Sequence, residues 1–387
     1  MHAERFKVSI SDEVLTDLRD RLSRTRWPSD AGNESWAYGT QQEYLAGLVR
    51  YWREGFDWRA QEKAINAFSH FRTTLDGNPI HFIHEKGKGP NPTPIILTHG
   101  WPWTFWDMHK LIGPLTNPAA YGGDPRDAFD VVVPSLPGFG FSTPLTKTGV
   151  NWWKTADLWV QLMEGLGYPR FAVHGGDWGG LVNLQLGHKY ADRLIGLYNL
   201  GLAPLDVFSK GPPPPTEYGP DEQEALGRTM LFFMEGSAYS AVQSTRPQTL
   251  AYAMHDSPVG MCAWILEKRR AWSDCGGDVE KVFSRDELLT TMTLYWATQS
   301  FGSAARYYYE ATHQPWQPSH DRMPVVEAPT AVAVFPRDVA QMPRRWAERY
   351  INLQRWTPFP RGGHFGPMEQ PELLVEDIRS FFRTLRG

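Results

Sequence analysis

A glycine-rich turn at residues 174–180, HGGDWGG, places one carboxylate among small residues. It follows the apolar run FAV at 171–173, which is typical of a buried strand. Glycines on both sides of Asp177 allow a sharp strand-to-helix turn, because the backbone comes too close there for Cβ atoms. We therefore expect Asp177 to be a nucleophile that such a turn holds in the open.

The choice of aspartate indicates the reaction. A carboxyl with a reference pKa of ~3.9 is anionic at neutral pH and needs no base to activate it. When it attacks a saturated carbon it leaves an ester, which water can cleave, whereas a serine would leave an ether. The turn thus predicts displacement at a saturated carbon followed by ester hydrolysis. An ordinary turn with a solvated aspartate is the alternative that this stretch alone leaves open.

Ester hydrolysis requires a base for water, and His364 is the candidate. It stands in RGGHFGPME, just after the last predicted strand, and Asp338 in AVAVFPRD follows the preceding strand as its acid partner. The order nucleophile, acid, histidine is that of α/β-hydrolases. His99 and His174 also lie near strand ends, but no acid is placed to orient them, and we interpret them as structural.

An oxyanion site is expected from two backbone N–H groups, those of Trp101 and Trp178. Trp101 stands in HGWPWTFW after the strand PIILT, where Pro102 fixes the turn, and Trp178 directly follows the nucleophile. The stretch HFIH at 81–84 is not a metal pair, because a spacing of three along a strand points the rings to opposite faces. We predict neither a metal nor a cofactor.

Strands and helices alternate around these residues, which predicts a mostly parallel sheet covered on both faces. The alternation breaks at KGPPPPTEYGP, residues 210–220, and a mostly helical stretch follows to about residue 322. The sheet then resumes and the helix PELLVEDIRSFFRTL closes the chain. An insertion at the carboxyl ends of the strands would cover the site that those ends form.

Four segments are predicted. Helices at 11–26, with Ser11 as N-cap, and at 41–54 precede a short strand at 78–87 and make the N-terminal region an appendage. The predicted divisions are an N-terminal domain at 1–92, the first part of the core at 93–205, a helical cap at 206–324 and the second part of the core at 325–387.

Composition narrows the function classes. A net charge of -4 and the absence of a basic stripe argue against nucleic acid. The start MHAERFKVSI has no apolar run, and no later segment is apolar enough to span a bilayer, so we expect no membrane association. Cys262 and Cys275 could pair, but a chain of this size needs no such staple, and we expect a reduced, cytoplasmic protein.

Together these motifs resemble the epoxide hydrolases of the α/β-hydrolase superfamily, particularly the microsomal-type group, over nearly the whole chain. LRDRLSRTRWP and YWREGFDWRAQE are similar to its N-terminal domain, GGDWGG to its nucleophile motif and HGWP to its oxyanion motif. The family's acid is often glutamate, where this chain has Asp338. The resemblance implies an α/β-hydrolase fold with a helical cap and cofactor-free conversion of an epoxide and water into a vicinal diol.

The resemblance also implies two cap tyrosines that hydrogen-bond the epoxide oxygen. EGSAYSAVQSTRP and SAARYYYEA are similar to the segments that carry them, which gives Tyr239 and Tyr308, with Tyr307 and Tyr309 as alternatives to the second. A phenol with a pKa of ~10 is a neutral donor at pH 7. Similar soluble bacterial enzymes act in secondary metabolism, so an antibiotic-biosynthetic role stands beside a detoxifying one.

Two other functions stay open at this point. A haloalkane dehalogenase also uses an aspartate followed by tryptophan, but it needs halide-binding donors in place of paired tyrosines. A catalytically inactive hydrolase could serve as a small-molecule receptor, which loss of a triad residue would favour. The Trp and Phe content suggests a bulky apolar or aromatic epoxide. The sequence leaves the oligomeric state open, a homo-oligomer included.

Overall fold

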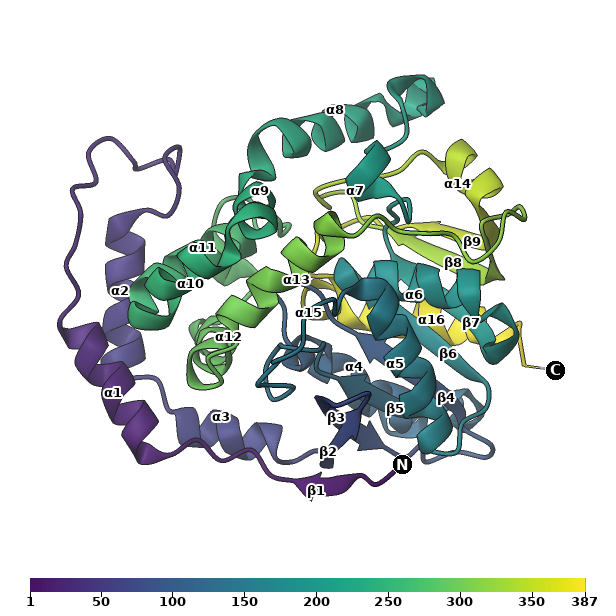
Figure 1. The fold of residues 1–387 in the computed structure, drawn as a ribbon, viewed down its shortest axis with the longest axis horizontal. Helices are drawn as coiled ribbons and strands as arrows, with labels where there is room; N and C mark the ends of the chain where they lie inside the picture. Colours follow the sequence, from purple (N-terminus) through teal and green to yellow (C-terminus); the bar gives the residue numbers. More distant parts are fainter. Residues whose placement is uncertain (387) are drawn as a thin grey trace.

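The computed structural model describes residues 1–386, and a nine-stranded sheet lies at its centre with the order β1-β2-β3-β5-β4-β6-β7-β8-β9 (Figure 1). Strands β5, β4, β6, β7, β8 and β9 run parallel to their neighbours in this order, which confirms the predicted mostly parallel sheet. The strands are β1 (Glu4–Phe6), β2 (His70–Leu75), β3 (Asn78–Glu85), β4 (Thr93–Thr98), β5 (Phe129–Pro134), β6 (Phe171–Gly176), β7 (Leu194–Leu200), β8 (Val326–Val334) and β9 (Ile351–Pro358).

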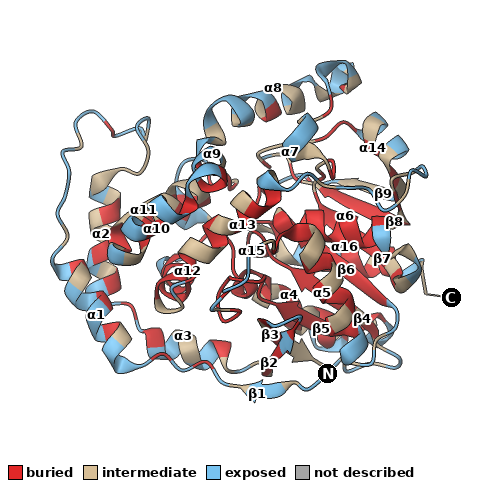
Figure 2. Cartoon of the chain, in the orientation of Figure 1, coloured by how far each residue is buried: buried red, intermediate tan, exposed pale blue. Residues whose placement is uncertain are grey.

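Helices cover both faces of this sheet. Helices α5 and α6 pack against each other on one face, and α4 and α16 pack against each other on the other (Figure 1). The central strands β5 and β6 are buried along their whole length, as Figure 2 shows, and this burial explains their continuous apolar sequences. The helices of the core are α4 (His109–Thr116), α5 (Trp152–Gly165), α6 (Trp178–Lys189), α14 (Arg344–Tyr350), α15 (Gly366–Glu369) and α16 (Pro371–Arg383).

The N-terminal region is joined to the sheet by three strands, where the sequence predicted one. Strand β1 pairs with β2, β2 pairs with β3, and β3 pairs with β5, and all three pairs are antiparallel. Asp76 and Gly77 form the two-residue turn between β2 and β3, both with positive φ. Asp-Gly is a strong hairpin signal, but β2 buries only half of its residues and lacks the alternation that would reveal it.

The same region also reaches the cap through its helices, which lie beside α10 (Pro247–Asp256), α11 (Pro258–Ala271) and α12 (Arg285–Ala297) (Figure 1). Ser11 caps the first helix by accepting the N–H of Val14, as predicted. The indole N–H of Trp52 donates to Thr293 Oγ1 at 3.0 Å. These helices are α1 (Asp12–Ser23), α2 (Gln42–Glu54) and α3 (Trp58–Ile65).

A series of helices is inserted between β7 and β8, after the carboxyl end of β7. A π-helical turn at Phe232–Gly236 joins α8 to the following helix. The helices of the insertion are α7 (Val207–Lys210), α8 (Gln223–Leu231), α9 (Ala238–Thr245), α10 (Pro247–Asp256), α11 (Pro258–Ala271), α12 (Arg285–Ala297) and α13 (Phe301–His313). Short 3-10 turns complete the chain, at Phe105–Met108, Pro118–Tyr121, Pro125–Asp127, Ala191–Arg193, Pro215–Glu217, Pro220–Glu222 and Val279–Lys281.

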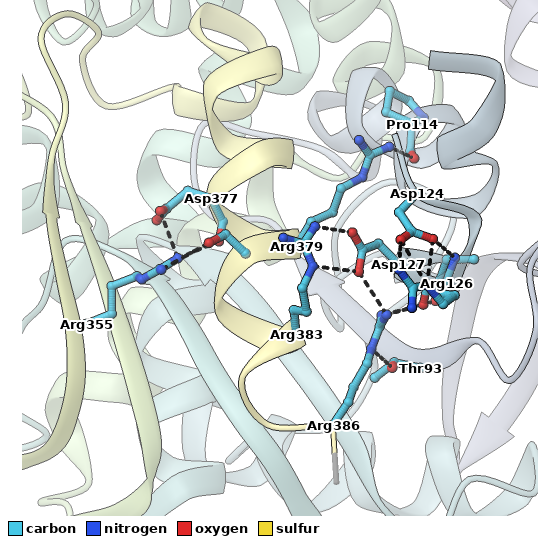
Figure 3. Close-up of polar contacts among 12 residues, drawn as sticks. Thr93, Pro114, Asp124, Arg126, Asp127, Arg355, Asp377, Arg379, Arg383 and Arg386 are labelled. Atoms are coloured by element: carbon cyan, nitrogen blue, oxygen red, sulfur yellow. Dashed lines mark hydrogen bonds and ion pairs between the residues drawn. The ribbon is translucent and has the colours of Figure 1, made fainter. Parts of the chain in front are cut away.

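Ion pairs attach the C-terminal helix to the core (Figure 3). Asp127, whose side chain is 3% exposed, forms ion pairs with the guanidinium groups of Arg383 and Arg386. Arg379 of the same helix is buried and donates to the carbonyl of Pro114. Burial lowers the pKa of Arg379, with the nearby acids Glu376 and Asp127 opposing the change. These contacts hold α16 against the end of α4.

Two further findings concern the whole chain. Within residues 1–386, no helix has the length and apolar character needed to cross a bilayer. Cys262 and Cys275 are both buried and unpaired, and burial raises the pKa of the Cys262 thiol to about 12.

Candidate active site

The turn between β6 and α6 holds Asp177 in a strained backbone conformation. Its φ of 54° and ψ of -127° lie in a region that residues other than glycine rarely adopt. The neighbouring glycines are required by close approach: a Cβ on Gly175 would stand 2.7 Å from the Thr98 carbonyl oxygen, and one on Gly179 only 2.0 Å from it. This packing forces the turn and presents the Asp177 side chain beyond the sheet.

The two oxygens of the Asp177 carboxylate have different surroundings. Oδ1 accepts the backbone N–H of Trp101 at 2.8 Å and that of Trp178 at 2.7 Å. Oδ2 faces Nε2 of His364 at 3.4 Å. One oxygen is therefore held by the two N–H groups that the sequence singled out, while the other points toward the histidine.

His364 and Asp338 form a buried pair at the ends of β9 and β8. Nδ1 of His364 lies 2.8 Å from Asp338 Oδ1, and both residues are 8% exposed. Burial opposes a charge on the imidazole, but the charges of Asp338 and Asp177 outweigh it and raise the pKa of His364 to about 10. At neutral pH the imidazole is thus a cation between two carboxylates.

Two tyrosines from the cap stand opposite the carboxylate. Tyr239 in α9 and Tyr308 in α13 both line the cavity with Asp177, and their ring centres are 5.8 Å apart. Trp101 stacks on Tyr239 with 4.8 Å between ring centres. Burial raises the pKa of both phenols and the negative charge of Asp177 raises it further, so both stay neutral.

The neighbours of Tyr308 point elsewhere. The Tyr307 hydroxyl lies 2.7 Å from Thr155 Oγ1 on a buried helix, and the Tyr309 ring stacks on His313 with centres 3.8 Å apart. Successive helical residues are rotated by about 100°, so one member of the YYY run faces the cavity and the others turn away.

The cavity has a volume of about 190 Å³. Its wall is mostly apolar, with Ser237, Ser240 and Asn199 among the few polar side chains besides the residues described above. Apolar side chains from the core and the cap complete it, among them Leu181, Leu202, Val207, Phe208, Phe232 and Met342.

The remaining histidines near this edge of the sheet have structural partners. His99 bonds to the Gly100 carbonyl and accepts the Leu136 N–H, and His174 bonds to the Tyr198 carbonyl. His81 contacts Ser135, whereas His84 contacts Tyr168, so the HFIH rings do point to different environments. Within the described part of the chain, no group of three or more His, Cys, Asp or Glu side chains could hold a metal.

The comparisons with known proteins agree over the whole chain. A model described as epoxide hydrolase N terminus matches residues 3–108, and a model of the alpha/beta hydrolase fold matches residues 93–371. A protein of Stigmatella aurantiaca is 44% identical over 99% of this chain and 85% of its own length. Epoxide hydrolase 1 of Sus scrofa is 36% identical over 98% of this chain and 88% of its own. The chain belongs to the epoxide hydrolases.

A solved relative shows how completely this epoxide hydrolase shares the family's fold. The Aspergillus niger epoxide hydrolase superposes with a TM-score of 0.86 at 29% identity, covering 100% of this chain and 97% of that one. The expected enzyme class, a hydrolase that acts on epoxides, is confirmed by these relatives.

The sequence did not indicate how the cap of this epoxide hydrolase is attached to the oxyanion loop. Arg269 of α11 donates to both oxygens of Asp107, at 2.6 and 3.1 Å, and to the Pro102 carbonyl at 3.0 Å. Both charged side chains are 2% exposed. Arg269 stands in the charged run EKRR, where nothing in the sequence marks it as buried, and its partner lies 162 positions away. Glu369, which contacts the His364 loop, was also missed.

Proposed function

We propose that this epoxide hydrolase forms a vicinal diol in two steps, through a covalent ester on Asp177. The observation that carries the proposal is the asymmetry of the Asp177 carboxylate. Oδ1 accepts hydrogen bonds from both backbone N–H groups, whereas Oδ2 points toward His364. Such an arrangement suits a carboxylate that attacks with one oxygen and later becomes an ester whose carbonyl oxygen is stabilised.

In the first step, Oδ2 attacks a carbon of the epoxide and its C–O bond breaks. The oxygen that leaves the carbon develops negative charge and takes a proton from Tyr239 or Tyr308. Both phenols line the cavity with Asp177, and both are kept neutral by burial, so they are suited to donate. This requirement for proton donors favours an epoxide over a haloalkane, because a departing halide needs no proton.

Ester formation then prepares the base. It neutralises Asp177, one of the two anions that raise the pKa of His364. The pKa of the imidazole falls, and its proton is returned to the tyrosine that lost one. His364 becomes a neutral base at the moment when the second step needs it, still oriented by Asp338.

In the second step, His364 takes a proton from water, and the hydroxide adds to the ester carbon. The resulting oxyanion develops on Oδ1, which keeps the Trp101 and Trp178 N–H groups as donors. The intermediate collapses by breaking the bond between this carbon and Oδ2. The diol leaves with Oδ2 and with a proton from His364, and the new carboxyl returns its own proton to the imidazole.

The cavity supports a proposal for the substrate class. A mostly apolar wall with few polar side chains suits an apolar epoxide, and the aromatic rings of Phe208, Phe232 and Trp272 suit one that carries an aryl group. A cytoplasmic location belongs to the same proposal and is supported by the two buried free thiols.

A single turnover in ¹⁸O-labelled water, with enzyme in excess over styrene oxide, tests the covalent route. The diol should be mostly unlabelled, and one label should appear in the peptide that carries Asp177. Direct attack by water, with Asp177 acting only as a base, would instead give labelled diol in the first turnover. Mass spectrometry of the diol and of the peptide distinguishes the two.

A further inference from the structure

The loop that carries His364 has every backbone N–H from residue 362 to residue 365 engaged by one group of acceptors. Gly362 donates to Asp274 Oδ2 at 2.9 Å and His364 donates to the Trp272 carbonyl at 2.8 Å. Gly363 and Phe365, the residues on either side of the histidine, both donate to Glu369. Because all four consecutive N–H groups are hydrogen-bonded, the backbone of the loop is held in one position.

Glu369 is central to this group of acceptors because its carboxylate hydrogen-bonds both to the histidine loop and to Asp274. Its Oε2 accepts the N–H of Gly363 at 2.9 Å and that of Asp274 at 2.8 Å, and its Oε1 accepts the N–H of Phe365 at 2.8 Å. The residues 272–274 directly follow helix α11 of the cap. One carboxylate thus joins the histidine loop to the cap through three backbone N–H groups.

Close packing reinforces the contact. A Cβ on Gly363 would stand 2.6 Å from the Trp272 carbonyl oxygen, so the two segments touch directly. On the other side, the Arg337 N–H donates to the Gly362 carbonyl at 3.0 Å, next to Asp338. The histidine loop is therefore set between the cap and the segment that carries its acid partner.

We propose that Glu369 is a positioning residue that sets His364 for the second step, hydrolysis of the ester. The inference rests on the proposed two-step function. Within residues 1–386, the side chain of Glu369 hydrogen-bonds to backbone N–H groups around the histidine and in the cap segment and to no other group, and it does not line the cavity. The first step depends on Asp177, Tyr239 and Tyr308, none of which it contacts. Its removal should accordingly slow one half-reaction and spare the other.

Glu369→Gln is the sharpest test, because the new amide brings N–H donors to a point where three N–H groups already converge. Misplacing a base by about 1 Å costs on the order of a hundredfold, so ester hydrolysis should slow by roughly ten- to a hundredfold. The rate of ester formation should change by no more than a few-fold. Stopped-flow tryptophan fluorescence with styrene oxide follows both phases, and intact mass should show the ester accumulating in Glu369→Gln.

The matched control is Glu372→Gln, which removes an exposed carboxylate at the start of α16 and should leave both rates unchanged. Glu369→Asp, a shorter carboxylate, should slow hydrolysis in the same direction but less, and it serves if the glutamine variant does not fold. Equal losses in both steps, or wild-type hydrolysis in Glu369→Asp, would overturn the inference.

His364→Gln separates this inference from the function on which it rests. If His364→Gln accumulates the ester but Glu369→Gln hydrolyses it at the wild-type rate, only the role of Glu369 is wrong. If His364→Gln forms no ester while the substrate is still consumed by the wild-type enzyme, the two-step function itself is wrong.

Discussion

The sheet side of the cavity wall is formed by turns at strand ends and by the start of α6, whereas the cap side is formed largely by helices. On the sheet side, Asp177 is held in a strained conformation by glycine packing and by two N–H groups. On the cap side, Tyr239 and Tyr308 lie on regular helices, and the nearby α8 and π-helical turn expose Met230, Leu231, Phe233 and Met234. The candidate nucleophile is thus on a strained turn, and the proposed proton donors are on helices of the cap.

The difference suggests a division of work. The charged side chains lie on the sheet side, where His364 stands between two carboxylates. The neutral phenols of Tyr239 and Tyr308 lie on the cap side. Two buried connections join the walls, Arg269 with Asp107 and the acceptors around Glu369. Substitutions on the two sides should therefore affect different steps and different properties.

The largest effect is expected from Asp177→Ala. Without the carboxylate no ester can form, so diol production should fall below detection with styrene oxide. Circular dichroism should remain that of the wild type, because the turn accepts a small side chain. Turnover near the wild-type rate would contradict the assignment of Asp177 as nucleophile.

His364→Gln should stop turnover at a later point. Ester formation needs no base, so the variant should be alkylated once and then stall. Intact mass should increase by the mass of the epoxide, and the increase should map to the peptide of Asp177. An unmodified protein after incubation with an epoxide that the wild type converts would count against the scheme.

On the cap side, Tyr239→Phe and Tyr308→Phe should each slow ester formation, by on the order of a hundredfold if neither phenol compensates for the other. The double variant should nearly stop it. Tyr307→Phe is the matched control, since its hydroxyl contacts Thr155 and not the cavity. Stopped-flow measurement of the first phase compares them, and a larger loss in Tyr307→Phe would contradict the cap assignment.

The charged histidine should also be visible in stability. The pKa of His364 in the folded protein, about 10, lies above the ordinary value of 6.5. The cation therefore stabilises the fold fully below about pH 6.5, and this contribution is lost as the pH rises through about 10. Denaturant unfolding of the wild type and of His364→Gln should show a stability difference that shrinks across this range. A constant difference would show that the imidazole is not charged in the resting enzyme.

The smallest effect concerns the strained turn. Asp177→Gly and Asp177→Ala remove the same carboxylate, but glycine accepts a φ of 54° without strain. The glycine variant should therefore be more stable than the alanine variant by about 1 kcal/mol, as measured by denaturant unfolding. Equal stabilities would mean that the backbone relaxes once the side chain is gone.

Much of this organisation could be read from local patterns. The strands β4 to β8 coincide with apolar runs that end in turn residues, whereas β9 is a more polar strand. The glycines around Asp177 and the tail RGGHFGPME mark the turns that carry the candidate residues. Strand β2 could not be read in this way, because its half-buried pattern has no clear period and its burial depends on its neighbours β1 and β3 and on helix α5. The catalytic roles of the site residues stay predictions until the variants are measured.

The sequence by itself determined the fold class and predicted the type of chemistry, because residue type, spacing and chain order carry both. An aspartate between glycines, followed later by an acid and a histidine at strand ends, is a local signal that needs no coordinates. Only the tertiary structure decided which tyrosine of the YYY run faces Asp177, that Oδ1 and not Oδ2 takes both N–H groups, and that Glu369 holds the loop of His364. These positions depend on the rotation of helices and on contacts between segments far apart in the chain. Tertiary packing sets both, and local sequence patterns do not predict them.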